Sequence, residues 1–293
     1  MPLSIVDAQV HIWAESTPER PWPARHAPHR PVPITAESLL ADMAQAGVQR
    51  AVLVPPSWEG ERNDVCLAAA QAYPDRFAVM GRLDPEHPDS PARIAHWREQ
   101  PGMLGLRFTF HRPSLQPLLT EGKADWLWPL AERAGVPIMM TCPFSIMHIA
   151  ERIAGEHPGL RLVIDHLGLL PGTRDAEAFA GFAHLLALAR FPNVAVKASA
   201  LPCYTQDVWP YRALHGYLRQ AFDAFGPQRL FWGTDLSRLP CSYAQAVRMF
   251  TEQLDWLQGD DREAVMGRSL MQWLGWPASA STSTATSPAT SRA

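Results

Sequence analysis

Eight short apolar segments, separated by amphipathic stretches, constrain the fold of this chain more than any other feature of its sequence. Several are rich in Val, Ile, Leu and Phe on both faces, which is typical of parallel strands buried under helices. The segments are residues 4–11, 50–54, 77–83, 104–110, 137–142, 161–168, 194–200 and 229–235. Their regular recurrence predicts repeated strand-helix units.

Helices are predicted between these segments. Residues 35–46 and 178–188 carry apolar side chains at helical spacing. The helix-to-strand joins contain glycine, asparagine or proline, as at Gly47 and Asn193, and these residue types end helices. Eight strands alternating with helices favour a single-domain α/β fold, the (β/α)8 TIM barrel, over residues 1–276. An open doubly wound sheet is the alternative.

Composition argues against several classes of protein. The formal net charge is −3 and the Lys and Arg residues are scattered, so no basic surface favours nucleic acid. A run of about 18 apolar residues would indicate a membrane span, and the chain has neither that nor a signal-peptide pattern. We therefore expect a cytoplasmic protein that acts on a small molecule and could form a homo-oligomer. The Ser-, Thr- and Ala-rich residues 277–293 predict a flexible tail.

Polar residues at the strand ends are the candidates for chemistry, because barrel enzymes place functional groups there. Gln9 and His11 are two residues apart in an extended segment and should share a face. Arg107, His166 and Asp235 lie within or at the end of three other segments. Each could also be a hydrogen-bonded structural residue.

Two kinds of anionic partner are possible for Arg107. Facing the barrel interior, this arginine needs an anion, either a substrate carboxylate or an internal partner such as Asp235. Adjacent strand residues face opposite sides, so with His166 turned inward we expect Asp165 to brace the helix layer.

Aromatic residues in the loops after the strands predict a flat or ring-containing ligand, although such residues often only pack loops down. They are Trp13, Trp22, Trp58, Tyr204 and Trp209. The proline-rich residues 15–33, with His26 and His29, predict a lid or a simple surface excursion. Asn63 is a further polar candidate.

The cysteines are weaker candidates. Cys142, Cys203 and Cys241 fall at or beyond strand ends, where a nucleophile could lie. A cysteine nucleophile needs a neighbouring base or a lowered pKa, and nothing in the sequence indicates one. We therefore predict that they are reduced thiols and small buried apolar residues.

Five motifs, in order and at the predicted strand positions, resemble signatures of the amidohydrolase superfamily. They are Asp7-Ala-Gln-Val-His-Ile-Trp13, Gly105-Leu-Arg-Phe108, Val163-Ile-Asp-His-Leu-Gly168, Val196-Lys-Ala-Ser199 and Phe231-Trp-Gly-Thr-Asp235. Residues 5 to 276 resemble most the amidohydrolase-related group that includes 2-pyrone-4,6-dicarboxylate lactonase and the sugar lactonases.

This resemblance implies a barrel hydrolase in which Asp235 activates water, while His11 and His166 bind a metal or polarise the carbonyl. The first His of the usual H-x-H pair is Gln9 here, residues 138–142 supply no His, and the fourth segment ends without a bridging lysine. These departures argue against a binuclear zinc centre. One zinc ion could still be held by His11, His166 and Asp235, but we favour catalysis without a metal cofactor.

The sequence therefore predicts hydrolysis of a lactone or related carboxylic ester. Asp235 would take a proton from water, and Arg107 would bind a substrate carboxylate. Gln9, Trp13, Trp58 and Tyr204 complete the predicted substrate site. The alternatives are a metal-dependent decarboxylase of an aromatic or unsaturated acid, and a non-catalytic ligand-binding barrel.

Overall fold

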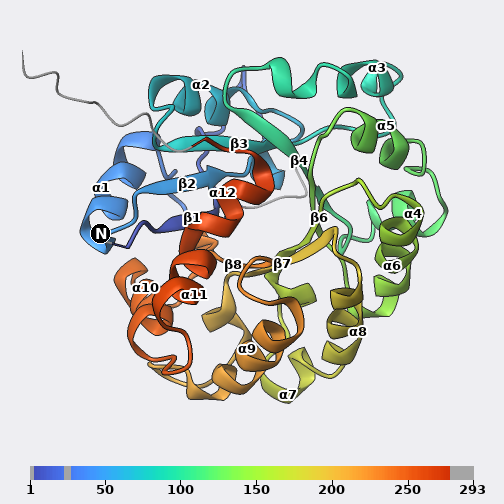
Figure 1. Cartoon of the computed structure of the whole chain (residues 1–293). Coiled ribbons are helices and arrows are strands. Elements are labelled where there is room, and N and C mark those ends of the chain that lie inside the picture. Colours follow the sequence, from blue (N-terminus) through green and yellow to red (C-terminus); the bar gives the residue numbers. More distant parts are fainter. Residues whose placement is uncertain (1–2, 23–27, 278–293) are drawn as a thin grey trace, which may run out of the picture.

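A computed structural model describes residues 3–22 and 28–277. It contains one sheet of eight parallel strands, paired in the order β1 to β8, and this confirms the predicted (β/α)8 barrel (Figure 1). The strands are β1 Val6–Val10, β2 Arg50–Leu53, β3 Phe77–Gly81, β4 Met103–Thr109, β5 Ile138–Thr141, β6 Leu162–Ile164, β7 Val194–Ala198 and β8 Leu230–Trp232. All eight lie within one residue of the predicted segments or inside them. The predicted tail lies outside the described residues from position 278 onward.

Helices surround the strands (Figure 1). They are α1 Ala36–Ala46, α2 Asp64–Ala72, α3 Ser90–Ile94, α4 Gln116–Thr120, α5 Leu127–Arg133, α6 Met147–Glu156, α7 Asp175–Ala178, α8 Phe182–Ala187, α9 Arg212–Phe225, α10 Tyr243–Glu252, α11 Gly259–Glu263 and α12 Ser269–Leu274. None of the helices in the described part of the chain has the length and apolar character needed to cross a bilayer.

Two predicted helices have different outcomes. The helix predicted at 35–46 is confirmed as α1, which begins with a capping box at Thr35 and ends at Gly47, whose φ of 75° suits glycine. The single helix predicted over 178–188 is wrong, because the chain leaves helical geometry between α7 and α8. Phe144 packs against Gly181 at this break, where a Cβ would lie 2.6 Å from the Cβ of Phe144.

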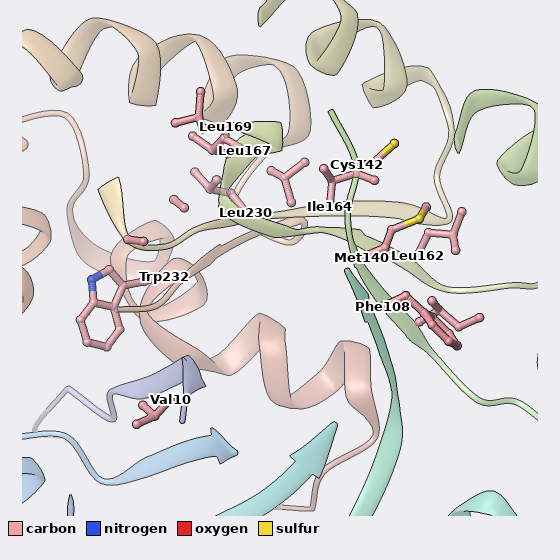
Figure 2. Packing of buried hydrophobic residues seen from close by; sticks show 14 of the residues in the cluster. Val10, Phe108, Met140, Cys142, Leu162, Ile164, Leu167, Leu169, Leu230 and Trp232 are labelled. Atoms are coloured by element: carbon pink, nitrogen blue, oxygen red, sulfur yellow. The ribbon is translucent and has the colours of Figure 1, made fainter. Parts of the chain in front are cut away.

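The core has two layers because strand side chains alternate between the faces of the sheet. Outward side chains such as Val10, Phe108 and Trp232 pack beneath the helices (Figure 2). Inward side chains, including Val6 and Phe231, fill the barrel with Leu270 of α12. Helix α12 therefore closes the end of the barrel where the strands begin and leaves the opposite end for the functional residues (Figure 1).

An extra residue in β1 changes which way its polar side chains face. Asp7 pairs with Ala51 and Val10 pairs with Leu53, so three steps along β1 match two along β2. The sheet therefore directs Asp7 towards Tyr243 of α10, whereas Gln9 faces His166, which follows β6.

Asp7 joins the first and last strands. Its buried carboxylate accepts hydrogen bonds from the backbone N of Thr234 at 2.9 Å and the hydroxyl of Tyr243 at 2.8 Å, and Gln9 O accepts from the N of Asp235 at 2.9 Å. Burial without a cationic partner raises the pKa of Asp7 to about 6, although these hydrogen bonds oppose the rise.

Replacing Asp7 tests this account through the pH dependence of stability. A folded-state pKa above the unfolded value means that the native protein binds the proton more tightly, so this group lowers stability as the pH rises from about 4 to 7. Two pKa units correspond to about 3 kcal/mol. We therefore compare the free energy of unfolding of the wild type with that of Asp7→Asn. The difference, wild type minus variant, should fall by up to about 3 kcal/mol between pH 4 and pH 7. Guanidinium unfolding at several pH values measures it.

The exposed Glu86→Gln substitution is the matched control for loss of one carboxylate. A difference that rises with pH would show that the native structure favours the ionised Asp7, contrary to this account.

Candidate active site

A cavity of about 230 Å³ opens at the carboxyl ends of the strands. Its wall combines residues from six strand ends or following loops with part of the 15–33 segment. The lining residues are His11, His29, Ser57, Trp58, Arg107, Thr109, His111, Arg112, Thr141, His166, Leu169, Pro171, Asp235 and Arg238.

His11 is held in one tautomer at the end of β1. Its Nδ1 lies 2.6 Å from the carbonyl oxygen of Val54, which can only accept, so Nδ1 carries a proton. The other ring nitrogen, Nε2, lies 3.0 Å from Asp235 Oδ1. The shared direction predicted for Gln9 and His11 is confirmed, since both reach this cluster while Val10 packs outward.

A row of buried charged groups lies beneath the cavity. Arg107 Nε is 3.0 Å from Asp165 Oδ2, and Lys197 Nζ is 2.8 Å from Asp165 Oδ1. Burial raises the pKa of Asp165, but the charges of Lys197 and Arg107 outweigh burial and hold it below its usual value. Arg107 therefore has an internal anionic partner, which is Asp165 and not Asp235.

The expectation that Asp165 braces the helix layer is wrong. Val163 belongs to the inner cluster, so strand alternation turns Asp165 inward as well. His166 reaches the cavity because β6 has already ended and His166 adopts φ 53°, a left-handed conformation. Asp235 has a similar φ of 51°, three residues after the end of β8. Such conformations are uncommon for residues other than glycine and often mark functional positions.

His166 is neutral and its proton is on Nδ1. Lys197 Nζ donates to Gln9 Oε1 at 2.6 Å, so the amide nitrogen of Gln9 points to His166 Nε2, 3.4 Å away. Because the amide N–H donates, Nε2 of His166 must be the acceptor and carries no proton. The ring proton is therefore on Nδ1, which donates to Ser199 Oγ at 2.8 Å. Burial lowers the pKa of His166 to about 3, consistent with a neutral ring.

Asp235 is ionised. Its Oδ2 lies 3.2 Å from Arg238 Nη1 and 3.7 Å from His166 Nε2. Burial raises the pKa of Asp235, but its interactions with His11 and His166 and the charge of Arg238 outweigh burial and hold it well below its usual value.

The remaining charge around the cavity is positive. Arg107, Arg112 and Arg238 line it, and among its lining residues only Asp235 is acidic. Burial lowers the pKa of both His29 and His111 to about 4, so both rings are neutral near pH 7. The cavity therefore offers cationic groups to an anionic ligand.

The aromatic residues predicted to contact substrate separate into two groups. Trp58 lines the cavity beside His29, with ring centroids 4.6 Å apart. Trp13 and Tyr204 do not line it, contrary to expectation, and both are almost fully buried. The ring of Trp13 packs edge-on against Trp58 behind the wall, and Tyr204 lies 5.7 Å below the guanidinium of Arg238. They support residues that line the cavity.

Other loop candidates are structural. The side chain of Asn63 accepts from Arg82 N at 2.7 Å and donates to Arg82 O at 2.9 Å, which holds its helix start to β3. Trp22 donates to the carbonyl of Ala14, and Trp209 packs against Tyr211.

The structure describes only part of the predicted lid, residues 15–33. His26 lies outside the described residues, whereas His29 lines the cavity and its Nδ1 is 2.8 Å from Ser237 Oγ. Arg30 bonds the carbonyls of Leu236 and Ser237, so this part of the segment rests on the loop after β8. Closure of the segment stays a prediction.

The cysteines behave as apolar residues. Burial raises the pKa of Cys142 to about 12 and of Cys203 to about 11, so these thiols stay protonated near pH 7. Cys241 has a raised pKa for the same reason.

The donor set can be tested against a metal ion. In the described part of the chain, no group of three or more His, Cys, Asp and Glu residues is arranged to hold one. The chemistry of the donors nevertheless suits a single divalent ion, because Nε2 of His166 is unprotonated, the Val54 carbonyl engages only Nδ1 of His11, and Asp235 Oδ1 is buried without an aligned hydrogen bond. Gln9 Oε1 is already bound to the Lys197 amine and is not available to a second ion.

Sequence reasoning missed three charged residues of the site. Lys197 was visible only as part of a motif, although a lysine inside an apolar strand is a signal in itself. Arg238 and Arg112 lie in loops, and nothing in the sequence indicates which loop arginines turn inward.

Comparisons with known proteins agree with this architecture. The chain is 28% identical over 255 residues to L-fucono-1,5-lactonase of Burkholderia ambifaria, covering 80% of this chain and 81% of that protein. The fold matches an amidohydrolase of Burkholderia multivorans with bound zinc, with a TM-score of 0.78, 21% identity and coverage of 94% of this chain and 100% of that one.

A Pseudomonas putida protein whose proposed activity is 2-pyrone-4,6-dicarboxylic acid hydrolysis has a TM-score of 0.75, 24% identity and coverage of 94% of this chain and 99% of that one. A family model described as amidohydrolase matches residues 6–286, which is nearly the whole chain. The chain therefore belongs to the amidohydrolase family and is a hydrolase, not a non-catalytic barrel.

Proposed function

We propose that this hydrolase opens a lactone ring or cleaves a closely related carboxylic ester, with Asp235 as the base. The observation that carries the proposal is the buried, ionised carboxylate of Asp235, which faces two oriented histidines inside an arginine-lined cavity. The likeness to a sugar lactonase supports a lactone as the substrate.

The reaction follows from the positions of these groups. A water molecule beside Asp235 attacks the carbonyl carbon, and its proton becomes acidic and passes to the carboxylate as the new C–O bond forms. The bond between the carbonyl carbon and the ring oxygen then breaks. The ring oxygen takes up the proton, and the product is a hydroxy acid. His11, between Asp235 and the Val54 carbonyl, can carry the proton in transit when its Nε2 is protonated.

The tautomer of His166 changes the role expected for it. The sequence suggested that both histidines polarise the carbonyl, but Nε2 of His166 has no proton to donate. This nitrogen and Asp235 Oδ2 are two acceptors 3.7 Å apart. We assign His166 to orienting the attacking water: one O–H points to Asp235, and the other points to the His166 Nε2 lone pair, which the Gln9 amide reaches only at the long distance of 3.4 Å.

The arginines define the preferred substrate. Arg107, Arg112 and Arg238 line the cavity, and Asp235 is the acidic residue among its lining residues. A lactone that carries a carboxylate would accept charge-assisted hydrogen bonds from these arginines. Arg107 can contribute from the cavity wall while it remains bound to Asp165.

A divalent ion, if bound, would be held by His11, His166 and Asp235 and would supply polarisation of the carbonyl. Arg238 and His11 already face the carboxylate of Asp235, so the charge of this group is balanced within the chain. We therefore propose that the reaction proceeds without a metal ion.

Chelation tests the metal-free proposal. We expect protein dialysed against a chelator to keep its lactonase activity, because the base and its partners belong to the chain. Elemental analysis before and after dialysis accompanies the assay. One zinc per chain, lost together with activity and restored with it by added zinc, would contradict the proposal.

Replacing the base tests the reaction itself. We expect Asp235→Asn to lower kcat by at least about 10³-fold, because the proton of water then has no acceptor. The assay is a panel that includes 2-pyrone-4,6-dicarboxylate and L-fucono-1,5-lactone, with thermal unfolding to show that the variant folds.

The exposed Asp223→Asn substitution is the matched control. Full activity of Asp235→Asn would remove Asp235 as the base. A wild-type protein that releases CO2 from aromatic acids and hydrolyses nothing in the panel would favour the decarboxylase alternative.

The charge of the cavity predicts a selectivity. A charge-assisted hydrogen bond contributes about 1.5–3 kcal/mol, which is roughly 10- to 100-fold in binding. We expect Arg112→Gln to raise KM for 2-pyrone-4,6-dicarboxylate by this factor and to change KM for the uncharged L-fucono-1,5-lactone much less. Arg174→Gln, an exposed arginine outside the cavity wall, is the control. Equal effects on both substrates would argue against carboxylate recognition.

A further inference from the structure

Lys197 is a buried cation beside the catalytic cluster, and the proposed reaction does not use it. It points inward from β7, and its side chain is fully buried. Its Nζ lies 2.6 Å from Gln9 Oε1, 2.8 Å from Asp165 Oδ1 and 3.3 Å from Met139 Sδ. A buried amine held between an amide and a carboxylate needs a reason, because burial of a charge is costly.

Charge balance alone does not supply that reason. Arg107 already pairs with Asp165 at 3.0 Å, so one cation and one anion are matched without Lys197. The lysine therefore adds a positive charge to a pair that is neutral without it. What it contributes specifically is a donor aimed at the oxygen of the Gln9 amide.

This donor fixes the direction of the amide. With the amide turned over, the NH2 group of Gln9 would face the Lys197 amine at 2.6 Å, donor against donor. Gln9 therefore keeps its oxygen towards Lys197 and its N–H towards His166 Nε2. Without the lysine, either face of the amide could turn to the histidine.

The direction of the amide in turn decides the tautomer of His166. An N–H pointing at Nε2 requires that nitrogen to be an acceptor, and Ser199 Oγ can receive the proton on Nδ1 at 2.8 Å. A flipped amide would present its oxygen and favour a proton on Nε2, with Ser199 then donating to Nδ1.

We propose that Lys197 is a positioning residue, which acts through Gln9 to keep Nε2 of His166 unprotonated beside Asp235. This inference rests on the proposed function for its effect on turnover. Its effect on the tautomer can be observed whether or not the assigned reaction is correct.

The first variant is Lys197→Met, which keeps a similar side-chain volume and leaves the ion pair of Arg107 and Asp165 in place. We expect the ¹⁵N NMR signals of His166, identified by their loss in His166→Asn, to change from the Nδ1–H pattern to the Nε2–H or mixed pattern. With 2-pyrone-4,6-dicarboxylate as substrate, kcat should fall at least 10-fold while KM stays within about twofold.

The second variant is Gln9→Glu, which leaves Lys197 in place. Its carboxylate can accept from the lysine and also from Nε2–H of His166, so it should produce the same change of tautomer. This variant decides the question by itself if Lys197→Met fails to fold. Met139→Leu is the control, because it removes only the sulfur contact of Lys197.

The outcomes separate the two proposals. A wild-type His166 pattern and wild-type kcat in either folded variant would overturn the positioning role. A changed tautomer in a protein that hydrolyses no lactone would support the role of Lys197 and count against the proposed function. A purely structural lysine would lower stability and leave the tautomer as it is.

Discussion

The catalytic end of the barrel depends on one buried carboxylate, Asp165, placed between Arg107 and Lys197. Each cation would be costly to bury alone, and together they keep the pKa of Asp165 low despite its burial. The side of this cluster that faces β1 orients Gln9, which sets the state of His166. Removing Asp165 would leave two buried cations without their anion, so the order of the site rests on this residue.

The fold could be predicted because its information is local and repeated. Apolar segments show strand positions, and glycine or asparagine shows where helices end. The site was less accessible to such reasoning. Strand alternation correctly places Gln9 with His11, but it fails at His166, where a left-handed turn follows the strand and redirects the side chain. Nothing in the residue types shows such a turn in advance.

Burial explains the other differences. Trp13 and Tyr204 follow strand ends, as cavity residues do, yet they pack behind Trp58 and Arg238. Position at a strand end therefore does not distinguish a residue that lines the cavity from one that packs behind it. Arg238 and His29 reach the cavity on loops whose paths depend on long-range contacts, including the hydrogen bonds of Arg30 to the loop after β8. Lys197 is a signal that the sequence does carry, since a lysine within an apolar strand needs a buried partner.

The central claim is that Asp235 delivers water to a lactone whose carboxylate rests on the cavity arginines. A crystal structure of Asp235→Asn with bound 2-pyrone-4,6-dicarboxylate tests it most directly. The account predicts the ring carbonyl carbon within reach of a water molecule held by residue 235 and His166, with a substrate carboxylate on Arg112 or Arg238. A ligand seated with its carbonyl away from residue 235, or with its carboxylates in solvent, would contradict the account.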